Sequence, residues 1–318
     1  MREPCPRPPT VAVLIPCYNE AAAIGRVVRA FQEALPGARI HVYDNNSTDD
    51  TVAVAQAAGA LVGRETAQGK GHVVRRMFAD VEADVYVMVD GDATYDAARA
   101  PAMVDLLLDH RLDMVVGCRA GTDQGAYRTG HRFGNVLLTS SVRFLFGRQF
   151  TDMLSGYRVF SRRFVKSFPV LSTGFEIETE LTVHALELAM PVAELDTPYG
   201  ARPQGSVSKL RTYADGAKIL RLILSLYRNE KPLPFFSILS SLLVALALGL
   251  AVPLFRTYLA TGLVPRFPTA ILCTGLMVIA ALGYTCGFIL DTVTRGRKEV
   301  KKLAYLATPP SPRIQEGA

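Results

Sequence analysis

Two aspartates separated by one glycine, Asp90-Gly91-Asp92, are the residues of this chain whose types and spacing point most directly to chemistry. They follow the unbroken apolar run 85–89, which predicts a strand buried on both faces of a parallel sheet. Carboxylates at the end of such a strand are costly unless a cation meets them. Two hard oxygen ligands suit Mg²⁺ or Mn²⁺, with water and phosphate completing the shell. The alternative is a turn whose acids cap the next helix, because D-x-D is a short pattern.

Other polar residues directly follow predicted strands: Pro16, Tyr18, Asn19 and Glu20 after 11–15, Asp44 after 39–43, and Arg119 after 113–117. Ligands of an open α/β sheet collect beyond the carboxyl ends of its strands. We therefore expect these side chains at one rim with Asp90 and Asp92. A nucleotide bound together with a metal ion would fit that rim.

The elements that must position this rim alternate along the chain with short connections. Predicted strands at 11–15, 39–43, 61–62, 85–89 and 113–117 alternate with predicted helices at 21–35, 51–58, 72–78 and 101–110. Further helices are expected at 135–146 and from 174. This alternation predicts an α/β fold with a doubly wound parallel sheet.

Composition and missing motifs exclude several classes of protein. Apolar residues make up 49% and charged residues 20% of the 318 residues, so global disorder is excluded. The five cysteines are scattered without C-x-x-C, which argues against a disulfide framework and a structural zinc site. G-x-G-x-x-G is absent, and Gly69-Lys70-Gly71 lacks the spacing of a P-loop. Residues 1–9 have no secretory signal, and no nucleic-acid module is evident.

Two uncharged stretches near the C-terminus, 235–255 and 270–290, predict membrane helices. Each has 21 residues and would span about 30 Å, the thickness of the hydrocarbon layer. Residues 213–227 predict an amphipathic helix on the membrane surface. Basic residues flank the pair on its outer sides, at 228–231 and 295–302, which predicts both termini and the rim on the cytoplasmic side of the inner membrane.

The expected organisation is a catalytic domain at 1–211, a juxtamembrane amphipathic helix at 212–232, two transmembrane helices at 233–292 and a basic cytoplasmic tail at 293–318. The tail segment 298–306 could pair with a neighbouring subunit, so a homo-oligomer is one expectation.

These residues together resemble the family 2 glycosyltransferases of GT-A fold, and within them the polyprenyl-phosphate glycosyltransferases such as dolichol-phosphate mannose synthases and GtrB-type enzymes. The motifs that carry the resemblance are Ile15-Pro16-Cys17-Tyr18-Asn19-Glu20, Asp44 with 45–49, Gly69-Lys70-Gly71, Asp90-Gly91-Asp92, Gly117-Cys118-Arg119, Ser155-Gly156-Tyr157-Arg158, and the R-x-x-G-x-S-K-like loop from Arg202 to Lys209. The resemblance covers about residues 10–295. One departure is Thr94, which stands where many relatives have a glutamine that helps to hold the metal.

The resemblance implies transfer of a sugar, with inversion, from a UDP- or GDP-sugar to a polyprenyl phosphate such as undecaprenyl or dolichyl phosphate. Mg²⁺ or Mn²⁺ at Asp90 and Asp92 would neutralise the leaving diphosphate. The implied nucleotide-binding residues are Pro16, Tyr18, Asn19, Glu20, Asp44, Asn46, Lys70, Asp90 and Gly91. The implied acceptor-phosphate residues are Arg119, Arg132, Arg202, Ser206 and Lys209, and Asp152 is a candidate general base.

Three rival functions differ in testable ways. A processive synthase of this family would carry a Q-x-x-R-W signature, and this chain contains no tryptophan. A membrane-tethered transferase acting on a glycan or another non-polyprenyl acceptor stays open. A non-enzymatic membrane scaffold would not need the intact pair Asp90 and Asp92.

Overall fold

The computed structural model describes residues 7–120, 140, 150–174, 176–200, 221 and 224–310. The chain forms two compact units, one comprising Met1–Ile219 with Val300–Ala318 and the other Leu220–Glu299. The expected organisation into four segments stays a prediction, and the amphipathic helix expected at 212–232 falls mostly outside the described residues.

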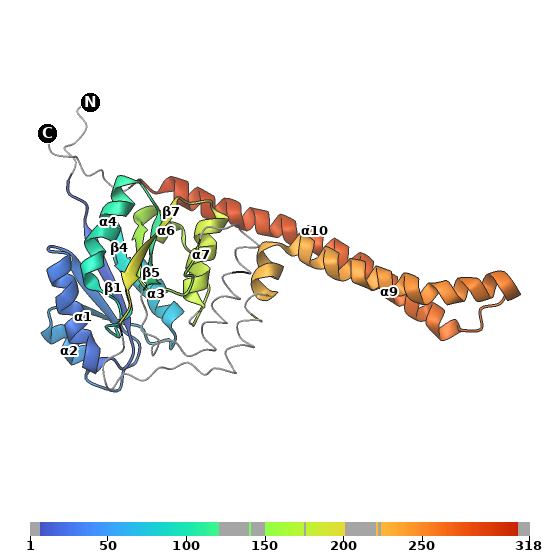
Figure 1. Cartoon of the computed structure of the whole chain (residues 1–318), viewed down its shortest axis with the longest axis horizontal. Coiled ribbons are helices and arrows are strands. Elements are labelled where there is room, and N and C mark those ends of the chain that lie inside the picture. The colour runs from blue at the N-terminus through green and yellow to red at the C-terminus, as the bar shows by residue number, and fades with distance from the viewer. Residues whose placement is uncertain are drawn as a thin grey trace, which may run out of the picture. The chain divides into compact units, whose positions relative to one another are not determined.

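Among the residues that the structure describes, the first unit is built on a seven-stranded sheet of order β3-β2-β1-β4-β6-β5-β7. Figure 1 labels β1, β4, β5 and β7 of this sheet. Its strands are β1 (Val11–Cys17), β2 (Arg39–Asp44), β3 (Leu61–Arg64), β4 (Val85–Met88), β5 (Met114–Ala120), β6 (Arg158–Ser161) and β7 (Val192–Pro198). The prediction of an α/β sheet is confirmed, but the prediction that it is wholly parallel is wrong. Strand β6 runs antiparallel to both β4 and β5.

The direction of β6 follows from where the chain enters it. Strand β5 ends at Ala120, and β6 begins beside it, because Val116 pairs with Arg158 and the amide of Gly117 donates to the carbonyl of Tyr157. The chain therefore returns to the sheet at the edge where it left. A strand that begins at the edge where its neighbour ends has to run antiparallel to that neighbour.

Helices cover both faces of the sheet. They are α1 (Ala21–Ala34), α2 (Thr51–Ala57), α3 (Lys70–Asp80), α4 (Ala100–Asp109), α6 (Arg162–Ser167) and α7 (Ile177–Glu187), with a short 3₁₀ turn, η1 (Ala97–Arg99). Helices α1, α2 and α4 pack together over one face, where Phe31 joins Val13 of β1 and Val87 of β4 in one apolar core. On the other face, Phe78 of α3 contacts Tyr86 of β4 and Phe160 of β6. The central strands are therefore buried on both sides, as their unbroken apolar runs predict.

The second unit contains the two helices that the uncharged stretches predict. Helix α9 spans Pro232–Thr261 and α10 spans Phe267–Ala307, and both are long and apolar enough to be candidate membrane spans. They pair as an antiparallel hairpin, in which the hydroxyls of Ser241 and Tyr284 lie 2.7 Å apart. Thr257 and Thr274 donate their hydroxyls to backbone carbonyls four residues earlier. These two hydroxyls are therefore satisfied within their own helices, as an apolar surrounding requires.

The last turns of α10 belong to the first unit. The ammonium of Lys301 lies 2.6 Å from Glu187 at the end of α7, and the hydroxyl of Tyr305 donates to Asp113, which precedes β5. Arg163 lies over the Tyr305 ring. Pairing of 298–306 with a neighbouring subunit stays a prediction, and in this chain Lys301 and Tyr305 contact Glu187 and Asp113 of the first unit.

A buried histidine in α7 makes the stability of the first unit depend on pH. His184 is 1% exposed, its ring packs against Phe164 and Phe168, and its Nε2 lies 3.1 Å from Ser167 Oγ. Burial, with a contribution from Lys301, lowers the pKa of His184 to about 3. Because this pKa lies below the unfolded value, the neutral ring stabilises the fold fully above about pH 6.5, and that contribution falls as the pH drops toward 3.

We expect His184→Leu to flatten this dependence. Between pH 7.5 and pH 5 the wild-type chain should lose about 2 kcal/mol more unfolding free energy than the variant. Denaturant unfolding at several pH values measures the difference in slope, whatever the stability of the variant at pH 7.5. Parallel slopes for the two proteins would contradict the assignment.

Candidate active site

The loops after β1 and β2 are bound to each other at the carboxyl edge of the sheet. Asn19 has a left-handed backbone (φ 53°); its amide donates to Ser47 Oγ at 2.9 Å, and its side-chain oxygen accepts from the amide of Thr48 at 2.8 Å. Asp44, at the end of β2, is 3% exposed and accepts from the amide of Ser47. Pro16, Tyr18 and Glu20 lie in or directly after β1 at the same edge.

The neighbouring asparagines fix the segment that leads into α3. Asn45, which the sequence analysis did not single out, donates to the carbonyls of Glu65 and Ala67 and accepts from the amide of Gly69. Asn46, a predicted nucleotide contact, is bound to the chain itself, because its amide donates to the carbonyl of Thr66 at 2.9 Å. The pair holds residues 65–69 beside β2. The asparagine run at this turn was visible in the sequence, but which member faces inward was not.

The glycines on either side of Lys70 allow the start of α3 to touch another backbone. Gly69 has φ +136°, and a Cβ there would overlap the carbonyl oxygen of Thr173. A Cβ on Gly71 would overlap the carbonyl oxygen of Ser172. This close approach explains the Gly-Lys-Gly motif physically: it brings the base of the Lys70 side chain to the segment that precedes α7.

The ammonium of Lys70 lies between two carboxylates. Its Nζ is 2.5 Å from Oδ1 of Asp90 and 2.5 Å from Oε1 of Glu178, and the side chains of Lys70 and Glu178 are 11% and 6% exposed. Burial alone would lower the pKa of Lys70, but the two carboxylates raise it well above its ordinary value. Lys70 is therefore a fixed positive charge. Glu178, in the first turn of α7, was not picked out from the sequence, because nothing in its spacing relates it to Asp90.

The two aspartates after β4 are held in different ways. Asp90 lies against Gly156, where a Cβ would overlap its carboxylate, so Gly156 of the Ser-Gly-Tyr-Arg motif makes room for it. Asp92 is 5% exposed, and its Oδ1 accepts from the hydroxyl of Thr94 at 2.6 Å. Thr94 therefore orients Asp92. Gly91 between them lies against Cys17, whose sulfur would be 2.7 Å from a Cβ there.

Arg119, the penultimate residue of β5, forms a two-pronged ion pair with Asp152. Nε and Nη2 of Arg119 each lie 2.7 Å from an oxygen of Asp152. Burial alone would raise the pKa of Asp152, but the hydrogen bonds and charge of Arg119 hold it below its ordinary value. In this arrangement Asp152 orients Arg119, and a carboxylate so engaged is a weak proton acceptor.

Arg158 anchors the segment that carries Ser155 and Gly156. Its guanidinium is fully buried and donates to the carbonyls of Met153 and Ser155 and to the hydroxyl of Thr182 in α7. It thereby fastens the start of β6 to α7, the helix that also carries Glu178. From the sequence, Arg158 is recognisable only as the last residue of the Ser-Gly-Tyr-Arg motif.

The rim carries a surplus of negative charge. Burial raises the pKa of the Cys17 thiol well above its ordinary value, and Glu20, Asp44, Asp90 and Asp92 add to the rise. The carboxylates of Asp90 and Glu178 both contact the ammonium of Lys70, and Asp92 follows Asp90 by two residues, so negative charge gathers on this part of the rim.

The donor set fits a hard cation. Among the residues that the structure describes, no group of three His, Cys, Asp or Glu side chains could hold a metal by itself. Two aspartates that leave coordination positions to water and phosphate match the habit of Mg²⁺ and Mn²⁺. Asp90 and Asp92 are the residues that would hold the ion, and when bound it would offset negative charge on phosphate oxygens.

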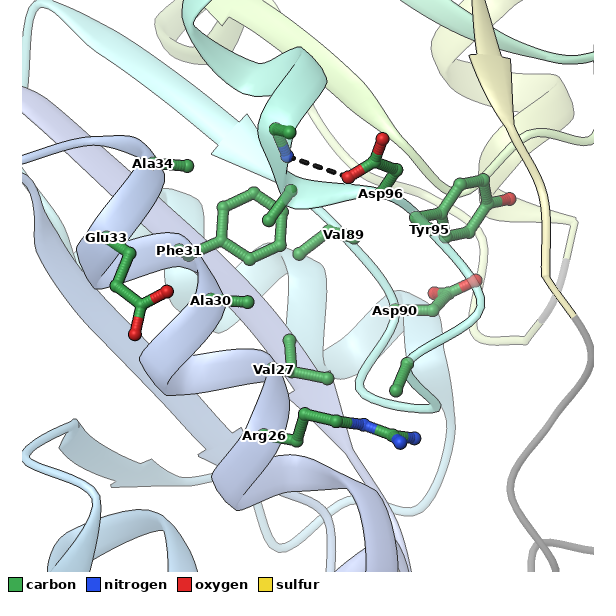
Figure 2. Close-up of a pocket in the computed structure, with 13 residues that line it drawn as sticks. Arg26, Val27, Ala30, Phe31, Glu33, Ala34, Val89, Asp90, Tyr95 and Asp96 are labelled. Atoms are coloured by element: carbon green, nitrogen blue, oxygen red, sulfur yellow. Dashed lines mark hydrogen bonds between the residues drawn. The ribbon is translucent and has the colours of Figure 1, made fainter.

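A groove of about 440 Å³ runs between α1 and the segment after β4 (Figure 2). Val27, Ala30, Phe31 and Val89 give it an apolar lining, and Asp90 lies at its margin. Figure 2 shows the Asp90 carboxyl and the Tyr95 hydroxyl turned away from α1. Lys70, Asp44 and Asp92 do not line the groove, so it adjoins the candidate site without containing its charged group.

Four predicted acceptor-phosphate residues, Arg132, Arg202, Ser206 and Lys209, lie outside the described residues, as do the helix expected at 135–146 and the end of the tail. Of that predicted set, the structure describes Arg119.

We expect Arg158→Leu to destabilise the first unit strongly, because two buried carbonyls and a hydroxyl would lose their donor. The expected cost is about 3 kcal/mol, or a Tm lower by roughly 6–12 °C. Arg76→Leu is the matched control: Arg76 forms an exposed ion pair with Asp80, and Tm should hardly change. Thermal unfolding of the full chain compares them, and equal Tm values would contradict the anchoring role.

Comparison with known proteins identifies the family of this chain. Residues 12–168 match the family model described as Glycosyl transferase family 2. The chain is 37% identical to the glycosyltransferase AglJ of Haloferax volcanii over 251 residues, which cover 77% of this chain and 81% of that protein. It is 28% identical to a dolichyl-phosphate hexose transferase of the same organism over 222 residues, covering 70% and 95%.

A solved structure shares the fold. The glucosyl-3-phosphoglycerate synthase of Mycobacterium tuberculosis, in complex with Mn²⁺, uridine diphosphate and phosphoglyceric acid, superposes with a TM-score of 0.55 at 22% identity, covering 69% of this chain and 78% of that one. The mixed sheet is thus of GT-A type. The family model and the long match to a relative lead to one conclusion: the chain belongs to glycosyl transferase family 2.

Proposed function

We propose that this glycosyltransferase transfers a sugar from a nucleoside-diphosphate sugar to a polyprenyl phosphate at the cytoplasmic face of a membrane. The observation that carries the proposal is the charged group at the rim, where Lys70 contacts Asp90 and the buried Asp92 follows two residues later, at the same edge as the bound loops after β1 and β2. This group suits a metal-bound diphosphate, the leaving group of a sugar nucleotide.

The donor is proposed to lie with its base and ribose near Tyr18, Glu20 and Asp44 and its diphosphate near Lys70 and the metal. Asp44 is buried and held by Ser47, so its position is set before a ligand arrives. The Mn²⁺ and uridine diphosphate in the solved structure of similar fold support a sugar nucleotide and a divalent metal. Mg²⁺ and Mn²⁺, and UDP and GDP, remain alternatives within the proposal.

The acceptor is proposed to be a lipid phosphate, because the chain carries two candidate membrane spans and resembles a dolichyl-phosphate hexose transferase along most of that protein's length. Arg119, oriented by Asp152, would bind the phosphate with a planar fork of donors. Arg132, Arg202, Ser206 and Lys209 are proposed to assist. A phosphate is already anionic at neutral pH, so positioning would supply much of the rate and Asp152 need not act as a base.

A second candidate is a membrane-tethered transferase with a water-soluble acceptor. One observation favours it: the solved structure of similar fold holds phosphoglyceric acid, a small phosphorylated acid. Both candidates use the same donor site and a phosphate-bearing ligand near Arg119. They differ in whether the acceptor reaches the site from the bilayer.

The test uses full-length protein in nanodiscs with a panel of UDP- and GDP-sugars and Mn²⁺ or Mg²⁺. We expect transfer of a sugar to undecaprenyl or dolichyl phosphate and no transfer to phosphoglyceric acid. Chromatography of the lipid fraction detects the product, and NMR of its anomeric centre is expected to show inverted configuration. Transfer to the soluble acid alone would favour the second candidate, and retained configuration would exclude direct in-line attack.

Asp92→Asn should lower transfer at least about 100-fold, because the metal would lose one of its two carboxylates. The matched control is Asp105→Asn, which removes an exposed carboxylate from α4 and should leave the rate unchanged. Initial rates over a Mn²⁺ titration, with EDTA as the metal-free limit, measure both variants. A wild-type rate in Asp92→Asn would contradict the assignment of Asp92 as a metal ligand.

A further inference from the structure

Charges of opposite sign alternate across the candidate site, from one side of the sheet's rim to the other. Lys70 contacts Asp90 and Glu178, and Arg119 contacts Asp152. Arg158 is buried, and the negative charges of Glu178 and Asp152 both act on its guanidinium. The proposed function gives Asp90, Lys70 and Arg119 a role in binding substrate or metal. It gives no role to Glu178, although this residue is 4% exposed and its carboxylate lies 2.5 Å from the ammonium of Lys70.

The position of Glu178 matters because Asp90 would have to serve two cations. Asp90 would be a ligand of the metal, and in this structure its Oδ1 is also 2.5 Å from the Lys70 ammonium. In a site of low dielectric, an ammonium paired with a single carboxylate competes strongly for it. Glu178 offers the same ammonium an equally close partner on the opposite side.

We propose that Glu178 is a positioning residue: by sharing the Lys70 ammonium with Asp90, it keeps Asp90 available to a divalent cation while the lysine stays in place for the diphosphate. This inference rests on the metal site of the proposed function. It identifies α7 as a third element of that site, with α3 supplying the lysine and β4 leading to the aspartate.

The backbone contacts support this role. Gly69 and Gly71 place the start of α3 against Ser172 and Thr173, only a few residues before α7. The amide of Gly71 donates to the carbonyl of Thr173 at 3.2 Å. Lys70 is therefore held toward α7 by its backbone, and Glu178 meets its far end. A direct role of Glu178 as a metal ligand is not supported, since within the described residues no third carboxylate completes a metal-binding group.

The test is a double-mutant cycle on Mn²⁺ affinity, measured by electron paramagnetic resonance of free Mn²⁺ with the full chain in nanodiscs and no sugar nucleotide present. Glu178→Gln should weaken Mn²⁺ binding about 10- to 100-fold, because Lys70 would then pair with Asp90 alone. In a Lys70→Met background the same change should weaken binding by no more than about threefold, because the competing ammonium is absent. Lys70→Gln replaces Lys70→Met if that variant does not fold.

The matched control is Glu187→Gln. Glu187 lies on the same helix and is paired with Lys301 at 2.6 Å, but it belongs to the opposite end of α7. Glu187→Gln should leave Mn²⁺ affinity unchanged. That result would show that losing a buried lysine–carboxylate pair in α7 does not by itself weaken Mn²⁺ binding.

Each outcome separates the inference from the proposed function. Wild-type affinity in Glu178→Gln, or an equal loss in both Lys70 backgrounds, would overturn the positioning role and leave the metal site standing. A wild-type chain that does not bind Mn²⁺ would overturn both. Transfer to lipid phosphate is not needed for the measurement, so an incorrect acceptor assignment would not affect the result.

Discussion

The ammonium of Lys70 between the carboxylates of Asp90 and Glu178 is the contact on which the candidate site depends. It joins three elements that are far apart in the chain: the start of α3, the end of β4 and the first turn of α7. The side chains of Lys70 and Glu178 are largely buried, and a buried charge is tolerated only when it is paired, so α3 and α7 cannot separate without leaving an unpaired charge in the interior. The glycines beside Lys70, and Gly156 beside Asp90, are needed because these elements approach at backbone distance.

Features set by local pattern could be predicted from the sequence. Local sequence is enough to predict the apolar strands β1, β2 and β4 and the amphipathic helix α1. Because ligands bind beyond the carboxyl ends of such strands, Asp44, Asp90 and Arg119 could then be expected at one edge of the sheet. The candidate spans were predicted for the same reason, although α10 continues well beyond the uncharged stretch. Its continuation carries Lys301 and Tyr305, whose polar contacts with the first unit leave no apolar signal.

Features that depend on pairing between distant segments could not be predicted. The antiparallel β6 is only four residues long, and its direction follows from contacts with β5 rather than from its composition. Glu178 could not be recognised from the sequence, because an acidic residue near the start of a helix is already explained by a favourable interaction with the helix dipole. Only the fold brings it to Lys70. Likewise, the sequence marked Asp152 and Arg119 separately, and only their 2.7 Å contacts join them.

The antiparallel β6 also has a consequence for how such an enzyme can diversify. Residue 120 ends β5 and residue 158 begins β6 on the same edge of the sheet, so both ends of the intervening segment lie beside the site. Changes in this segment that keep Asp152 and Gly156 would leave their contacts with Arg119 and Asp90, and the pairing of β5 with β6, in place. Sequence changes in this segment can therefore alter which acceptor the enzyme binds at this edge, while the residues proposed to bind the sugar nucleotide stay the same.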